Sequence, residues 1–233
     1  MRQRMENFSP RLYIISPPKL DPVTFAPTMV KALDAGDVAA FQLRLEGASD
    51  IDILRCCEFL MPIAHERDVA FIINDRADLA KRIKCDGIHL GAQDLDIKQA
   101  RQLLGVDTII GASCHDSKHL AMIAAEKGAD YVSFGPFYQS RTPFYPPEQY
   151  NPAKMVNPDL ISLWQEIAEI PCVAAGGIKP DGCPDLVEAG ADFICASTSI
   201  WEYPFGAAKA VRAFNDNIAY AIKKMAGPDI VFK

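Results

Sequence analysis

The chain has 233 residues, of which 49% are hydrophobic and 23% are charged, and its formal net charge is -6. This composition is typical of an ordinary globular protein and excludes a long disordered tract, while the length fits one α/β barrel of common size. The negative net charge argues against nonspecific nucleic-acid binding, although a local basic pocket for phosphate would be invisible in that total.

The sequence shows neither the pattern of a signal peptide nor that of a membrane-spanning helix. Residues 1–10, which we expect to form an N-terminal extension, carry charges without the apolar core of a signal peptide, and no later window reaches the about 18 apolar residues of a membrane span. The seven cysteines are odd in number and form no CxxC pair. We therefore expect buried, reduced thiols, a cytoplasmic protein and no thiol-ligated metal.

Short apolar runs alternate with longer amphipathic stretches along the whole chain. Continuous rather than alternating apolar runs indicate a parallel sheet covered on both faces. The eight predicted strands are Leu12–Ile15, Val38–Leu43, Val69–Ile73, Gly87–Leu90, Thr108–Gly111, Tyr131–Phe134, Cys172–Ala175 and Phe193–Ala196.

Helical patterns lie between these runs, for example at 117–127 and 158–169, where apolar residues recur every three or four positions. An internal echo supports the repeat, because CDGIHLG (85–91), GADYVSFG (128–135) and GADFICAS (190–197) each leave a helix and enter a strand at an aspartate. We predict a single-domain (β/α)₈ TIM barrel over residues 1–233. Two doubly wound halves are the alternative, although no GxGxxG fingerprint follows the first strand.

In such a barrel the functional groups gather where the strands end. The candidates at these ends are Gln42, Arg44, Asn74, Asp75, Arg76, Gly91 to Asp94, Ser113, His115, Gly135, Pro136, Gly176, Gly177 and Ser197 to Ser199.

Asp75 and Asp94 are carboxylates on neighbouring strand ends. Mg²⁺ prefers a few carboxylates together with phosphate oxygens, so the pair predicts a shared metal–phosphate site. The alternative is that each aspartate caps the helix that follows it.

The Gly176-Gly177 pair and Ser197-Thr198 follow the seventh and eighth strands, where barrels often bind phosphate with backbone amides. A plain tight turn is the alternative for the glycines. Of the four histidines, His115 alone follows a strand end and is the acid–base candidate, with a structural histidine as the alternative.

Residues 136–157 are rich in proline and aromatic residues and lack a helical period. They follow the sixth strand at the end of the barrel where sites form, so we predict a long active-site loop. The sequence leaves open whether this loop is a lid over the substrate or a packed surface excursion.

Six segments taken in order resemble the thiamine phosphate synthase family, which is related to thiazole tautomerase. NDR followed by HLGxxDL, GxSxH and FGP is the specific part, and the resemblance covers most of the chain. The segments are QLR (42–44), IINDRADLA (72–80), DGIHLGAQDL (86–95), IGASCH (110–115), GADYVSFGPFYQSRT (128–142) and IPCVAAGGIKPDG (170–182).

The resemblance implies a transferase that couples hydroxymethylpyrimidine diphosphate to thiazole phosphate and releases diphosphate, with Mg²⁺ on the leaving group. Asp75 and Asp94 would ligate the metal, and Ser113, Arg44 and His115 are the expected catalytic residues. The expected substrate-binding residues are Gln42, Arg44, Asn74, Ser113, Ser140, Arg141, Thr142, Gly176, Gly177, Ser197 and Thr198.

Two lysines of the family pattern are replaced. Glu46 stands where the family has the lysine of Gln-x-Arg-x-Lys, and Pro143 stands where it has the lysine of Thr-x-Thr-Lys. Both lysines would contact diphosphate, and the loss of an anion-stabilising donor can cost on the order of 10²–10³ in rate. Arg141 is the residue that could substitute for one of them.

Three hypotheses follow from this pattern. A synthase is favoured because Asp75, Asp94 and the glycine pair are retained. An isomerase resembling thiazole tautomerase would use His115 as its base, and a noncatalytic barrel that only binds thiazole or thiamine phosphate would tolerate the lost lysines. The expected partners are small molecules, with neither nucleic acid nor membrane, and a homo-oligomer stays open.

Overall fold

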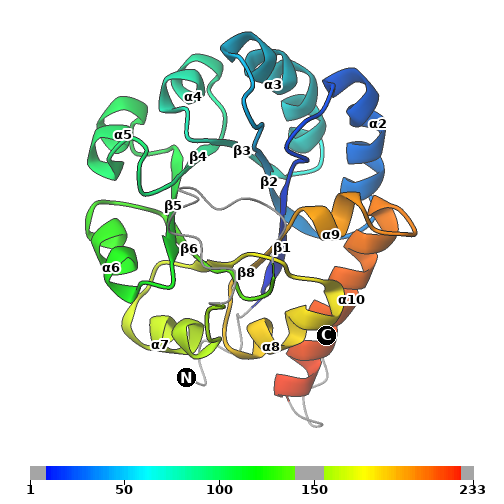
Figure 1. Ribbon diagram of the computed structural model, residues 1–233, viewed down its shortest axis with the longest axis vertical. Helices are drawn as coiled ribbons and strands as arrows, with labels where there is room; N and C mark the ends of the chain where they lie inside the picture. Colours follow the sequence, from blue (N-terminus) through cyan, green and yellow to red (C-terminus); the bar gives the residue numbers. More distant parts are fainter. Residues whose placement is uncertain (1–8, 140–154, 227–233) are drawn as a thin grey trace.

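The computed structural model describes residues 9–139 and 155–226, in which eight parallel strands form one closed barrel ordered β1 to β8. Figure 1 shows the strands around the centre with the helices in a ring outside them. The barrel confirms the predicted fold and excludes two doubly wound halves, because β8 pairs with β1. The strands are β1 (Arg11–Ile15), β2 (Val38–Leu43), β3 (Ala70–Asn74), β4 (Gly87–Leu90), β5 (Ile109–His115), β6 (Tyr131–Phe134), β7 (Cys172–Ala174) and β8 (Phe193–Ala196).

Several helices begin after a residue whose side chain caps the N-terminus of the helix. Asp21, Asp96 and Ser117 each accept a hydrogen bond from a backbone amide in the first turn that follows them, which satisfies a donor that the helix itself cannot. The helices are α2 (Pro22–Leu33), α3 (Asp50–His65), α4 (Ala77–Ile83), α5 (Ile97–Leu104), α6 (Lys118–Glu126), α7 (Asp159–Ile167), the short 3₁₀ helix η2 (Pro180–Gly182), α8 (Cys183–Glu188), α9 (Thr198–Trp201) and α10 (Ala207–Ala226).

Apolar side chains fill two layers. Residues such as Leu12, Phe41 and Ile88 point outward and are buried under the helices, whereas a smaller cluster fills the barrel interior. Both layers come from the same strands because successive side chains alternate between the two faces. The interior cluster consists of Tyr13, Ala40, Ile72, Tyr131, Val173 and Cys195.

The aspartates of the internal echo have a structural role at the start of the strands. Asp86, Asp130 and Asp192 each accept a hydrogen bond from the first amides of the preceding strand, at Phe71 (2.6 Å), Ile110 (2.7 Å) and Cys172 (2.8 Å) respectively. The repeat in the sequence therefore marks a repeated joint between neighbouring strands, on the side of the barrel opposite to the strand ends that carry the candidate site.

The seven cysteines are all buried and unpaired by disulfides, as the sequence predicts. In the part of the chain that the structure describes, no helix is long and apolar enough to cross a membrane.

Candidate functional site

A cavity of about 1100 Å³ lies where the strands end. Most of the predicted site residues that the structure describes lie in its lining, whereas the strand-end candidates Arg76, Gly135 and Pro136 do not. Ser140, Arg141, Thr142 and Pro143 fall outside the described residues. The predicted residues brought together here are Gln42, Arg44, Asn74, Asp75, Asp94, Ser113, His115, Gly176, Gly177, Ser197 and Thr198.

Asp75 and Asp94 are close neighbours in the cavity. Burial raises the pKa of Asp75 to about 7, and a hydrogen bond with Asp94 and the charge of Asp94 act in the same direction. Asn74 and Arg44 oppose that shift without cancelling it. Two carboxylates placed this close hold a proton between them or a cation.

Neither aspartate caps a helix, so that alternative is wrong. Helix α4 begins after Arg76 and has no side-chain cap, while Asp96 caps α5. Asp75 instead has a left-handed backbone (φ 63°), and its amide donates to the His89 carbonyl at 2.9 Å. Asp94 accepts a hydrogen bond from the Gly91 amide at 2.6 Å.

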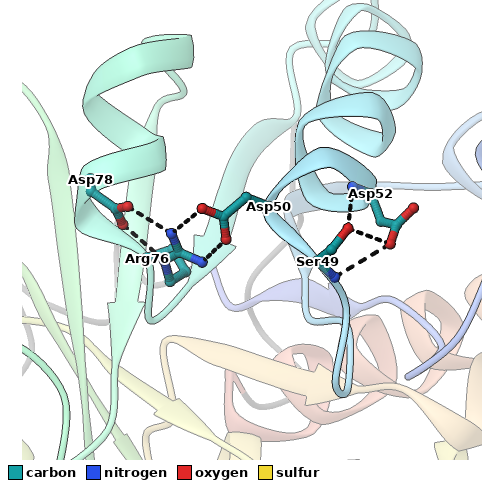
Figure 2. A network of polar contacts seen from close by, with 5 residues as sticks. All are labelled: Ser49, Asp50, Asp52, Arg76 and Asp78. Atoms are coloured by element: carbon teal, nitrogen blue, oxygen red, sulfur yellow. Dashed lines mark hydrogen bonds and ion pairs between the residues drawn. The ribbon is translucent and has the colours of Figure 1, made fainter.

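Arg76, the next residue along, is absent from the cavity lining. It forms ion pairs with Asp50 at the start of α3 and with Asp78 at the start of α4, as Figure 2 shows. Ser49 and Asp52 form a capping box at the same end of α3. Arg76 therefore joins the first turns of two helices and supports the β3–α4 turn that carries Asp75.

A chain of polar side chains crosses the barrel interior at the bottom of the cavity. The Tyr13 hydroxyl donates to Gln42 Oε1 at 3.0 Å and lies 2.9 Å from the Tyr131 hydroxyl. The Tyr131 hydroxyl is 2.9 Å from His89 Nδ1, and His89 Nε2 is 2.8 Å from Ser113 Oγ. Burial lowers the pKa of His89 to about 4, with Arg44 acting in the same direction, so its imidazole is neutral at neutral pH.

Sequence reasoning missed Tyr13, His89 and Tyr131 as members of the site. The alternation of side chains along a strand could have identified His89. Ile88 and Leu90 pack outward, so His89 between them points to the inner face of the barrel. The apolar runs concealed this signal, since a histidine or tyrosine inside such a run is typical of a core residue.

His115 is the last residue of β5 rather than a residue beyond it, and β5 extends four residues past its predicted end. Its backbone is left-handed (φ 52°), and the pairing of β5 with β6 shifts between Ser113 and His115. Burial lowers the pKa of His115, while Asp116 opposes the shift. A neutral imidazole at the cavity wall could accept a proton, so its acid–base role stays a prediction.

Gly176 and Gly177 have positive φ angles of 93° and 69°. A Cβ at Gly177 would lie 2.5 Å from the Gln139 carbonyl oxygen and 2.6 Å from that of Tyr138, so close packing by this chain's own backbone requires glycine. Opposite this turn, the Ser197 hydroxyl donates to the Ser16 carbonyl and the Ser199 hydroxyl donates to the Ile178 carbonyl. These two hydroxyls are therefore engaged within the protein.

Charges at the mouth of the cavity are mixed. Glu46 lies in the lining and is exposed, which places it in the site as a negative charge. Among the described lining residues, the positive charges of Arg and Lys are Arg44 and Lys179, and Lys179 was not predicted from the sequence. The described residues hold no cluster of three or more histidine, cysteine, aspartate or glutamate side chains that could hold a metal ion.

Comparisons with known proteins agree with this geometry. The family model described as thiamine monophosphate synthase matches residues 12–200. The chain is 52% identical to a thiamine-phosphate synthase of Rhodospirillum centenum, over 88% of this chain and 96% of the relative, and 45% identical to one of Erythrobacter litoralis, over 91% and 96%. Among solved structures, a thiamine phosphate pyrophosphorylase from Pyrococcus furiosus superimposes with a TM-score of 0.78 at 26% identity, covering 91% of this chain and 97% of that one.

Proposed function

This chain belongs to the thiamine monophosphate synthase family and is a transferase, and we propose that its barrel cavity couples hydroxymethylpyrimidine diphosphate to thiazole phosphate. The observation that carries the proposal is one cavity lined by every described residue that the resemblance assigns to catalysis, substrate binding or metal binding. The matched family and the two relatives are named synthases, which favours coupling over the isomerase and over the binding-only barrel.

The diphosphate end of the substrate would lie beside Asp75 and Asp94. Their donor chemistry fits Mg²⁺. Burial, with the neighbouring Asp94 acting in the same direction, raises the pKa of Asp75 to about 7, and a divalent cation between the two carboxylates would offset both effects. When bound, Mg²⁺ would neutralise charge on the leaving diphosphate. Arg44 contributes a further positive charge, and the Asn74 amide lies next to Asp75 in the lining.

The reaction would break the bond between the pyrimidine methylene carbon and the diphosphate oxygen, and the electron pair would leave with diphosphate. The thiazole nitrogen would then supply the electron pair of the new C–N bond. Gln42 would contact the pyrimidine, Ser113 would lie near the reacting carbon, and the backbone amides of Gly177 and Thr198 would hold the thiazole phosphate. Catalysis would consist mostly of positioning and of stabilising the departing anion.

The replaced lysines weaken the positive field expected around diphosphate. Glu46 adds a negative charge in the cavity lining, whereas Lys179 supplies a positive one near the glycine turn. Arg141 and the closing of the loop at 136–157 remain predictions, since residues 140–154 lie outside the described residues. We also propose a cytoplasmic location, which the seven free thiols support.

The test is to incubate the purified protein with both substrates and Mg²⁺ and to measure thiamine phosphate and diphosphate. We expect turnover that falls by at least about 10²-fold in Asp75→Ala, because Mg²⁺ would lose one of the two carboxylates that hold it beside the leaving diphosphate. Asp107→Ala is the matched control, since Asp107 is exposed and absent from the cavity lining. Failure of the wild-type protein to form thiamine phosphate would overturn the proposal.

A further inference from the structure

The polar chain across the barrel interior joins side chains from six strands. Tyr13 (β1), Gln42 (β2) and Asn74 (β3) form one half, and Tyr131 (β6), His89 (β4) and Ser113 (β5) continue it to the cavity wall. Gln42 and Tyr13 are almost fully buried. In a buried chain of this kind each hydroxyl or imidazole proton is expected to lie in one of the hydrogen bonds, because a buried donor or acceptor without a partner is costly.

The direction of the chain follows from its end at Gln42. Gln42 donates its amide N–H to Asn74 Oδ1 and offers Oε1 to Tyr13, so the single hydroxyl proton of Tyr13 points to Gln42. The Tyr13 oxygen must then accept the proton of Tyr131. The Tyr131 oxygen in turn accepts a proton from His89.

The same logic fixes the histidine and the serine. A neutral His89 that carries its proton on Nδ1 has a lone pair on Nε2, and this lone pair accepts the hydroxyl proton of Ser113. All four protons are then used in the four contacts. Ser113 consequently presents only oxygen lone pairs to the cavity.

Turning the Gln42 amide by half a rotation, together with the Asn74 amide so that the Asn74 N–H donates to Gln42 Oε1, reverses every step. The Gln42 N–H would donate to Tyr13, Tyr13 to Tyr131, and Tyr131 to His89 Nδ1, so the proton of His89 would move to Nε2 and donate to Ser113. The proton of Ser113 would then be available to a ligand. Both orders use the same side chains and satisfy every contact from Asn74 to Ser113, but the reversed order gives up the hydrogen bond that Asn74 donates to Asp75. The two orders also differ in what Ser113 offers to the cavity.

We propose that His89 is a positioning residue in a directional hydrogen-bond chain that ends at Ser113. Through this chain the orientation of the Gln42 amide sets whether Ser113 accepts or donates a hydrogen bond toward the substrate. In the arrangement of the structure Ser113 is an acceptor. An anion that contacts the Ser113 hydroxyl, such as the diphosphate oxygen next to the reacting carbon, can only accept a hydrogen bond, so this contact requires the reversed order. This last step rests on the proposed function, whereas the order of the chain in the protein without ligand does not.

The experiment is ¹⁵N NMR of the imidazole nitrogens in full-length protein labelled with ¹⁵N-histidine. His89 is one of four histidines and is assigned by the loss of its signals in His89→Gln. We expect Nδ1 protonated and Nε2 unprotonated at neutral pH. A wild-type His89 with its proton on Nε2 would overturn the assigned order.

Tyr13→Phe tests whether the chain acts over distance, because Tyr13 does not touch His89. The Tyr131 hydroxyl would lose its acceptor, so we expect it to donate to His89 Nδ1 and to shift the His89 proton to Nε2. Tyr138→Phe is the matched control, since the Tyr138 hydroxyl donates to the Gly182 carbonyl outside the chain and its loss leaves the tautomer unchanged. An unchanged tautomer in Tyr13→Phe would refute coupling along the chain.

Titration with inorganic diphosphate and Mg²⁺ tests whether the order of the chain reverses when an anion binds, separately from the order in the protein without ligand. Diphosphate that binds and shifts the His89 proton to Nε2 supports the switch at Ser113. Diphosphate that binds with no change of tautomer overturns it. Absence of diphosphate binding would count against the proposed function, while the wild-type tautomer and the Tyr13→Phe result would still decide whether the chain has the assigned direction.

Discussion

Asp75 has a left-handed backbone, a conformation that costs a residue other than glycine about 1–3 kcal/mol. Aspartate tolerates it better than most residues do, and the surroundings stabilise it, because the Asp75 amide donates to the His89 carbonyl and Arg76 holds the adjoining helix starts together. The turn thereby aims a carboxylate into the cavity beside Asp94. The same sequence, Asn-Asp-Arg, sends its arginine away from the cavity.

Glu46 is a residue whose negative charge we expect to oppose binding of diphosphate, because it replaces a lysine of the family pattern. Replacing it in Glu46→Gln removes a negative charge from the cavity lining, and we expect diphosphate to bind about two- to five-fold tighter, as roughly 0.5–1 kcal/mol of repulsion between partly solvated charges is relieved. Calorimetry with diphosphate and Mg²⁺ measures this.

Glu58→Gln is the control for the Glu46 variant, because it changes the net charge equally at an exposed position of α3 outside the cavity lining. Equal tightening in both variants would show that net charge, and not the position of Glu46, is responsible.

At the scale of helices and strands, the repeated aspartates Asp86, Asp130 and Asp192 connect neighbouring elements. Each one lies between a helix and an even-numbered strand and also contacts a side chain from an earlier helix: His65 contacts Asp86, Arg101 contacts Asp130 and Gln165 contacts Asp192. One carboxylate therefore joins a strand, its neighbour and a covering helix. This joint explains why the motif recurs with the period of two βα units, and it assigns the motif to stability and not to catalysis.

Asp130→Ala tests this assignment. The variant loses the hydrogen bond to the Ile110 amide and the pair with Arg101, so we expect the free energy of unfolding to fall by about 1–3 kcal/mol with little change in KM. Urea denaturation and steady-state kinetics check both parts. Asp107→Ala, at an exposed loop position, provides the baseline, and a large KM change in Asp130→Ala would contradict a purely structural role.

At the scale of the whole molecule, barrel closure and the ring of helices bury every cysteine. Helix α10 packs against both α2 and α8, which brings the last described helix against the first (Figure 1). Burial raises the pKa of Cys56 and Cys85 to about 11, and that of Cys57, Cys114, Cys172, Cys183 and Cys195 to about 12.

A raised thiol pKa means less thiolate, which is the reactive form, so we expect the native protein to resist alkylation at pH 8. Counting labelled cysteines by mass spectrometry should give none in the native protein and seven after denaturation. Cys195 is the critical position because it lies in the cavity lining. Rapid native labelling of Cys195 that diphosphate suppresses would show that the cavity, and not the closed fold, controls its access.

The sequence by itself determined the barrel and the polar residues at the strand ends that line the cavity. Continuous apolar runs, helical periods and polar residues at strand ends are local properties, and a parallel barrel converts them directly into one shared edge. Boundaries were less certain, as at β5, because Ser113 and His115 carry no local signal that a strand continues through them.

Only the tertiary structure decided the roles that depend on facing partners. Asp75 and Asp94 meet although they belong to different turns, and Arg76 faces two helix starts instead of the cavity. Tyr13, Tyr131 and His89 meet inside the barrel from strands far apart in the sequence. The physical reason is that hydrogen bonds and carboxylate pairs depend on ångström distances across the barrel, which a pattern along one strand does not contain.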